Sequence, residues 1–218
     1  MPTMPEKSVN FDNMNSLNDL NIVFETLTIG AAEPQLVLIE VPFRNGTLDE
    51  TDAFGDVRYK DRSITMGFLI PWWLDDQYGI FSNVQARLNG QRRKIAFSAD
   101  SDWYYEGRLT VGDFKIEDGF WKFEISATVG PYKKSVIPTT VTATATTEGT
   151  EMELSNDFMK AIPSFTTTAE VRVDFEGNSV TFSEGTHKST SIILKEGNNV
   201  LTLYGDSEVI IDYEQGRL

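Results

Sequence analysis

The chain has 218 residues, a formal net charge of −14, 40% hydrophobic residues and no cysteine. The hydrophobic content is enough for one large or two modest domains with packed cores, which argues against wholesale disorder. The absence of cysteine excludes disulfides, thiolate metal sites and a thiol nucleophile, and acidity in both halves of the chain argues against adhesion to DNA.

The first residues, MPTMPEKSVNFDN, lack the basic start and apolar stretch of a signal peptide. No apolar run approaches the roughly 18 residues of a membrane span. We therefore expect the chain to be made in the cytoplasm without membrane insertion. The glycosylation sequon at Asn45-Gly46-Thr47 should then be silent.

Residues 27–42 read as a strand, with Val37, Ile39 and Val41 on one side of the pleat. In the following VPFRNGTLDE, Asn45-Gly46 is a typical tight-turn dipeptide. However, the polar residues after it delay the expected partner strand until about Val57. We therefore predict a strand end that feeds a polar loop, followed by a strand over 57–70.

One helix is predicted, over residues 76–90. Ile80, Phe81, Val84 and Leu88 have the spacing of one buried face, Asp75 or Asp76 could cap the start, and Gly90 suits the end. Strands are predicted at 92–98, 102–116 and 120–130, separated by Asp/Gly turns. One helix with several strands predicts an α+β first domain that is mostly β.

The composition changes at residues 136–156, where threonine and alanine repeat and large apolar residues are few. This stretch is either a linker or an edge strand with small side chains. Short alternating strands with glycine turns follow, a pattern typical of a β-sandwich. We place the boundary near Pro131 and predict domains at 1–133 and 134–218.

No catalytic, cofactor or metal site emerges from the residues, so we predict a protein that is not an enzyme. His187, the single histidine, lies in GTHKST, which reads as an exposed polar loop. Residues 196–200, EGNNV, lack the continuation of a phosphate loop. Asp100 and Asp102 could bind calcium or hydrolyse glycosides, but Asp-x-Asp before a strand is a common turn pattern.

Aromatic residues are concentrated in the first half of the chain. They could stack on sugars, although such side chains more often fill a core or a subunit interface. The candidates are Trp72, Trp73, Trp103, Tyr104, Tyr105 and Trp121.

Several motifs, in order along residues 11–218, together resemble the signature of phage distal tail proteins. In that family a strand ends in a Pro-x-Arg-Asp/Asn-Gly-x-Leu-Asp turn, and Tyr-x-x-Arg opens the next strand. The matching positions are Pro42, Arg44, Asn45, Gly46, Leu48, Asp49, Tyr59 and Arg62. LNGQRRKIAFSADSDWYYEGRL, GPYKKS and the C-terminal IILKEGNNVLTLYGDSEVIIDYEQGRL are also similar to family segments. The chain departs from the usual Pro-Gly-Arg at Phe43, which predicts that the backbone there need not accept a positive φ.

The resemblance implies an assembly protein of a phage or prophage tail tip, with a ring-forming N-terminal domain and a galectin-like C-terminal β-sandwich. Family members form a ring, usually hexameric, around the DNA channel. They contact the tail tube protein, the tail-associated hub protein and receptor-binding proteins, and DNA passes without specific binding. We expect Arg44, Asn45, Tyr59 and Arg62 to contribute to a subunit contact of such a ring. The alternative is a carbohydrate-binding module protein, on the basis of the predicted sandwich and the aromatic residues.

Overall fold

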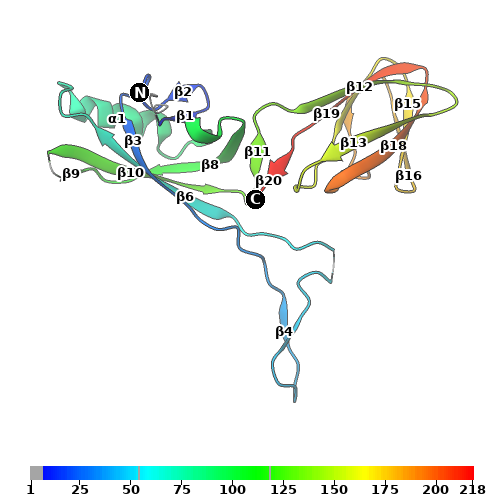
Figure 1. Ribbon diagram of the computed structural model, residues 1–218, viewed down its shortest axis with the longest axis horizontal. Helices are drawn as coiled ribbons and strands as arrows, with labels where there is room; N and C mark the ends of the chain where they lie inside the picture. Colours follow the sequence, from blue (N-terminus) through cyan, green and yellow to red (C-terminus); the bar gives the residue numbers. More distant parts are fainter. Residues whose placement is uncertain (1–6, 54, 118) are drawn as a thin grey trace, which may run out of the picture. The chain divides into compact units, whose positions relative to one another are not determined.

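The structure is a computed structural model that describes residues 7–53, 55–117 and 119–218. The chain divides into two units, Met1–Pro131 and Tyr132–Leu218. Each unit builds antiparallel β-structure around its own hydrophobic core (Figure 1). The division falls just before the boundary predicted from the sequence.

The first unit is a twisted antiparallel sheet with one helix and one long extension. Its strands pair in the order β2-β1-β7-β8-β10-β6-β3, and β9 pairs with β10. The elements are β1 (Val9–Phe11), β2 (Met14–Asn15), β3 (Val23–Ile29), β4 (Leu38–Glu40), β5 (Thr47–Asp49), β6 (Arg62–Ile70), α1 (Gln77–Leu88), β7 (Arg92–Phe97), a 3-10 turn (Ser98–Asp100), β8 (Trp103–Val111), β9 (Lys115–Glu117) and β10 (Phe120–Val129).

Strict alternation along β6 shows how the sequence forms this sheet. Ile64, Met66, Phe68 and Ile70 are buried, and the residues between them are only partly buried or exposed. Successive side chains of a strand point to opposite faces, so this pattern places one face of β6 in the core. The core therefore runs the length of β6, from the start of the strand to its end.

The helix α1 covers the sheet and contacts β6 and β8 (Figure 1). Its start is set by Asp76, whose carboxylate accepts a hydrogen bond from the Gly79 backbone N–H at 2.8 Å, and its buried residues are Phe81, Val84 and Leu88. The helix predicted over 76–90 is confirmed.

Several strand boundaries differ from the predictions. The strand predicted over 27–42 ends at Ile29, because the chain leaves the sheet there, and the strand predicted over 57–70 begins only at Arg62. The segment predicted as one strand over 102–116 is split into β8 and β9 around Gly112–Phe114. The short β1 and β2 were not predicted, since two or three residues carry no periodic signal.

The second unit is a β-sandwich of two four-stranded sheets, in the orders β12-β19-β14-β17 and β13-β18-β15-β16. Its core takes side chains from both sheets, including Phe165, Val173, Leu203 and Ile211. The strands are β11 (Lys133–Ser135), β12 (Thr139–Ala145), β13 (Thr150–Asn156), β14 (Ser164–Thr167), β15 (Val171–Phe175), β16 (Asn178–Phe182), β17 (Gly185–Lys188), β18 (Gly197–Gly205), β19 (Ser207–Tyr213) and β20 (Gly216–Arg217).

The stretch over 136–156 that could have been a linker forms β12 and β13, the edge strands of the two sheets of the sandwich. Thr140, Thr142 and Thr144 are exposed there, which fits an edge strand with small polar side chains. The predicted fold class, α+β and mostly β with a C-terminal sandwich, is confirmed.

Candidate functional site

An extended arm, residues 31–61, leaves the body of the first unit between β3 and β6. At its base the Gly30 N–H donates to the Ser63 carbonyl at 2.8 Å. Further out, backbone bonds continue to join the two sides, from Gln35 to Arg58 at 2.7 Å and from Glu50 to Val37 at 2.9 Å. In Figure 1 the arm, drawn in blue to cyan around the label β4, projects away from the sheet. It is therefore a hydrogen-bonded ribbon and not an irregular loop.

The apolar residues of the arm are uncovered. Neighbouring side chains point to opposite faces of a ribbon, yet Leu36, Val37, Leu38, Ile39 and Val41 are all exposed, with Leu36 58% and Leu38 51% exposed. A two-stranded ribbon has no second layer of its own that could bury these faces. Contiguous exposed apolar surface of this kind marks a contact site for another molecule.

The tip of the arm corrects two predictions. Leu38–Glu40 pair with Thr47–Asp49, so the hairpin closes across Asn45-Gly46 and does not wait for Val57. The loop has six residues, 41–46, which explains why a two-residue turn was not the right model. Phe43 has φ 64° and is fully exposed, so the prediction that this position need not accept a positive φ is wrong. A bulky residue in this conformation is an outlier that glycine would relieve.

The structure does not bring the four predicted interface residues together. Arg44 and Asn45 lie in the exposed tip loop, and their side chains have no partner among the described residues. Tyr59 lies nearer the base, where it forms a β-bridge with Pro34.

Arg62 differs from the other three predicted interface residues because it is buried, at 9% exposed, in the first strand after the arm. Its guanidinium donates to the Tyr105 hydroxyl at 2.9 Å and lies 4.9 Å from the centre of that ring. Its contact in this structure is thus with its own chain, at the base of the arm.

A second exposed surface lies at the other end of β6, and we call it the aromatic face. Tyr78 contacts Trp121 edge-on at 4.5 Å, and Trp121 stacks on Phe114 at 4.6 Å. Trp72 and Trp73 follow directly on β6 and are 64% and 63% exposed. Under this name we group the exposed Trp72, Trp73, Tyr78 and Ile116 with Phe114 and Trp121, which are partly buried against the core. Trp72 and Trp73 contact each other edge-on at 5.9 Å.

Of the aromatic residues singled out in the sequence, only some contribute to this face. Tyr104 and Tyr105 are buried in the sheet, and Trp103 lies at the start of β8. Tyr78, Phe114 and Ile116 belong to the face but were not singled out. They come from α1, the loop before β9 and β9 itself, so nothing in the local sequence connects them.

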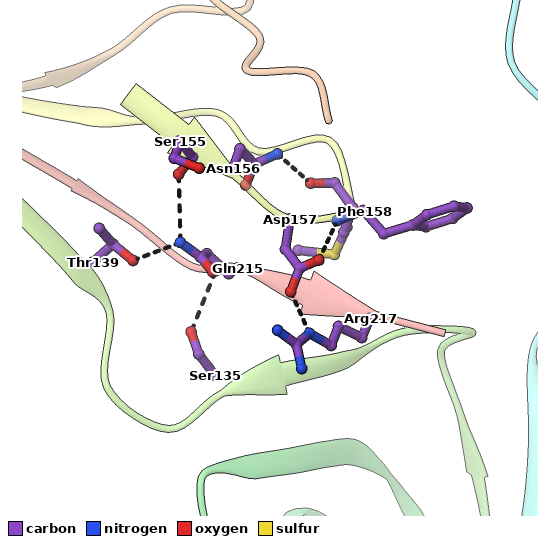
Figure 2. A network of polar contacts seen from close by, with 9 residues as sticks. Ser135, Thr139, Ser155, Asn156, Asp157, Phe158, Gln215 and Arg217 are labelled. Atoms are coloured by element: carbon purple, nitrogen blue, oxygen red, sulfur yellow. Dashed lines mark hydrogen bonds and ion pairs between the residues drawn. The ribbon is translucent and has the colours of Figure 1, made fainter. Parts of the chain in front are cut away.

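In the second unit a polar network ties the end of the chain to the strands that open the unit (Figure 2). The Gln215 side-chain amide donates to the Thr139 hydroxyl at 3.1 Å, and the Gln215 backbone N–H donates to the Ser135 hydroxyl at 3.3 Å. Arg217 forms an ion pair with Asp157, and β20 pairs with β11. The two ends of the unit are thereby closed on each other, which is a structural role.

Tyr213, beside this network, donates its hydroxyl proton to the Ser155 carbonyl at 2.6 Å. Burial raises the pKa of the Tyr213 phenol, and a hydrogen bond with Gln215 partly offsets the increase. The Tyr213 phenol therefore stays neutral at physiological pH.

The candidate chemical groups belong to different units, Asp100 and Asp102 to the first and His187 to the second. Asp100 ends the 3-10 turn and Asp102 precedes β8. His187 is not in a loop as predicted: it lies in β17, stacked on Phe182 at 5.9 Å, because β17 pairs with β14. Within residues 7–53, 55–117 and 119–218, no three His, Asp or Glu side chains come together as metal ligands do. None of the helices found there has the length and hydropathy of a bilayer span.

No protein-family model matches the sequence, and no curated protein is similar to it. Among solved structures, the Dit (gp19.1) protein of SPP1 is similar with a TM-score of 0.68 and 14% identity, over 97% of this chain and 99% of that one. That protein is described as a paradigm of the hub adsorption apparatus in phages that infect Gram-positive bacteria. A de novo designed double-stranded β-helix matches 38% of this chain with a TM-score of 0.25 and 12% identity, which is too low to carry an argument. The resemblance to phage distal tail proteins, first indicated by the sequence motifs, is confirmed in the fold across nearly the whole chain.

Proposed function

We propose that this protein is the structural hub of a phage or prophage tail tip, made in the host cytoplasm and located in the virion at the end of the tail. The fold shared with SPP1 Dit over 97% of the chain is the observation that carries the proposal. In this role the chain assembles with copies of itself into a ring, hexameric in the family it resembles. The ring surrounds the DNA channel and anchors tail tube, tail-associated and receptor-binding proteins.

The arm supports self-assembly. Burying one of its leucines against another copy would contribute about 1.5–3 kcal/mol, so a few such side chains suffice for a stable contact. The net charge of −14 supports the channel, because an acidic wall repels the phosphates of passing DNA and keeps them from binding. A subunit contact also gives a role to Arg44, Asn45 and Tyr59, which the arm carries at or near its surface. Arg62 would act in that contact only through the base of the arm.

The decisive experiment for the hub is location. Antibody labelling of virions or tail-like particles should mark the tail tip, and depletion of the protein should yield tails without a tip. Labelling along the tail tube, or at none of the particles, would count against the proposal.

Self-assembly is tested with the double variant Leu36→Ser/Leu38→Ser. Sedimentation of the purified protein should show association weakened at least tenfold, since two apolar contacts are lost. Val200→Ser is the control, because Val200 is an apolar residue that is 49% exposed and lies on the second unit. Association that the double variant leaves unchanged would exclude the arm as the contact.

A carbohydrate-binding role is the second candidate, and the exposed pair Trp72 and Trp73 favours it. Exposed tryptophans can stack on sugar rings through their faces. A glycan array that shows binding lost in Trp72→Ala would support this role, and an array without binding would remove it.

A further inference from the structure

The chain contains the dipeptide Asn-Gly twice, at Asn45-Gly46 in the tip of the arm and at Asn89-Gly90 after α1. At this dipeptide the asparagine side chain is readily attacked by the backbone nitrogen that follows it, because glycine has no Cβ to hinder the approach. All four residues are exposed, so access to solvent does not distinguish the two sites. Their hydrogen bonds do distinguish them.

The second dipeptide is held in place at the end of α1. The Asn89 N–H donates to the Gln85 carbonyl at 3.0 Å, and the Asn89 side-chain oxygen accepts a hydrogen bond from the Val111 N–H at 3.1 Å. The Gly90 N–H donates to the Leu109 carbonyl at 2.9 Å. The side-chain amide and the nitrogen that would attack it are therefore both engaged elsewhere. Both of these bonds must open before the two groups can react.

The first dipeptide has none of these restraints. Among the residues that the structure describes, neither the Asn45 side chain nor the Gly46 N–H has a hydrogen-bond partner. Within the loop 41–46 the Arg44 N–H donates to the Val41 carbonyl, which leaves Asn45 and Gly46 outside that bond. A Cβ built on Gly46 would meet no atom within 4 Å apart from the neighbouring residues. The loop therefore has both the freedom and the space for the Gly46 nitrogen to reach the Asn45 amide carbon.

We propose that Asn45 is a deamidation site of the folded protein and that Asn89 is protected from the same reaction. The Gly46 backbone nitrogen loses its proton and forms a bond to the amide carbon of the Asn45 side chain. The side-chain nitrogen takes up a proton and leaves as ammonia, which closes a succinimide ring. Water then opens the ring at either of its carbonyls. One opening gives aspartate, and the other gives isoaspartate, in which the main chain runs through the side chain.

The reaction changes the charge and the shape of the tip. Arg44 is the one charged residue in the loop 41–46, so the new carboxylate changes the formal charge of the loop from +1 to 0. Isoaspartate also lengthens the main chain of the loop that joins β4 to β5. A partner that recognises the tip would therefore meet a different surface on aged protein, as it does after other modifications that change charge.

The test compares the two sites within one molecule. The purified chain is incubated in mildly alkaline buffer, and peptide mapping by mass spectrometry then separates asparagine, aspartate and isoaspartate at each site. In the folded protein Asn45 should deamidate at least about tenfold faster than Asn89, because hydrogen bonds must open first at Asn89. In urea that unfolds the chain, the two rates should become similar, since only the dipeptide then matters.

Asn45→Gln is the matched variant, because it keeps an amide whose longer side chain disfavours ring closure. It should remove the reaction at the tip and leave the slow reaction at Asn89 unchanged. Equal rates at the two sites of the folded protein would overturn the proposal. So would a chain in which both sites react only in urea, or in which neither reacts even there. Each of these outcomes is independent of where the protein lies in a particle, so the hub function is tested separately.

Discussion

The arm and the body of the first unit use similar apolar residues for opposite purposes. In the body, β6 alternates buried Ile64, Met66 and Phe68 with residues that face outward. In the arm, Leu36 to Ile39 are apolar on both faces, and all remain exposed. The difference teaches that hydrophobic side chains in a β-ribbon stabilise the fold only where a second layer covers them. Where no layer does, they are available to a partner.

The largest expected effect is on the free energy of unfolding, where a buried phenylalanine of the body, Phe68, and an exposed one of the arm, Phe43, should differ. Phe68→Ala should lower the free energy of unfolding by about 3–5 kcal/mol, because Phe68 is 1% exposed and packs against Phe24 and Phe123. Phe43→Ala should change it by no more than about 0.5 kcal/mol, because Phe43 has no packing to lose. Urea denaturation measures both. Equal losses would mean that the arm is part of the cooperative core.

The next largest effect is a difference in stability between variants of two arginines, the buried Arg62 and the exposed Arg44. Arg62→Ala should destabilise the unit by about 1–3 kcal/mol, since it leaves the buried Tyr105 hydroxyl without its partner, whereas Arg44→Ala should leave stability unchanged. Thermal unfolding measures the stability of both variants and sedimentation measures their association, so together they distinguish a role in the fold from a role in the subunit contact. If Arg62→Ala lost assembly but kept its stability, Arg62 would belong to the subunit contact as the sequence motif suggested.

A smaller effect concerns the strain at the tip. Phe43→Gly should relieve about 1 kcal/mol of left-handed backbone strain and slow hydrogen exchange at the Arg44 N–H, which bonds the Val41 carbonyl at 3.2 Å, by about fivefold. Association between copies should nevertheless weaken about tenfold, because the phenyl side chain of residue 43 is gone. Phe43→Ala keeps the backbone strain. It should weaken association as much as Phe43→Gly does, but it should not slow hydrogen exchange at the Arg44 N–H. If Phe43→Gly associated as strongly as the unmodified chain, the backbone of residue 43 and not its phenyl side chain would make the contact.

The smallest expected effect is a change in the pKa of Asp49, in the second half of the arm. Hydrogen bonds from the Thr51 hydroxyl and from the Thr51 backbone N–H lower the pKa of Asp49. Since the folded pKa is depressed, the stabilisation is present at neutral pH and lost as the pH falls below about 4. Thr51→Ala should raise the pKa of Asp49 toward its ordinary value, as NMR titration can measure. An unchanged pKa would mean that the backbone bond alone sets it.

Local signals predicted local structure well. The helix with its Asp76 cap, the strands at Arg92–Phe97 and Phe120–Val129 and the sandwich of the second half all depend on periodicity and capping within one segment. The motifs around Arg44 to Arg62 indicated the correct fold. Prediction failed where a residue's role depends on distant parts of the chain. His187 is an example, because its segment was predicted as a loop but forms β17 by pairing with β14.

The sequence by itself determined the helix, many of the strands, the acidity, the absence of thiol chemistry and the resemblance to a tail hub, because each of these is a property of composition or of neighbouring residues. Only the tertiary structure decided that Val37, Ile39 and Val41 are uncovered, that Arg62 is buried and that six scattered side chains form the aromatic face. The physical reason is that burial depends on what packs against a strand. An alternating apolar pattern reads the same whether a core or another molecule covers it.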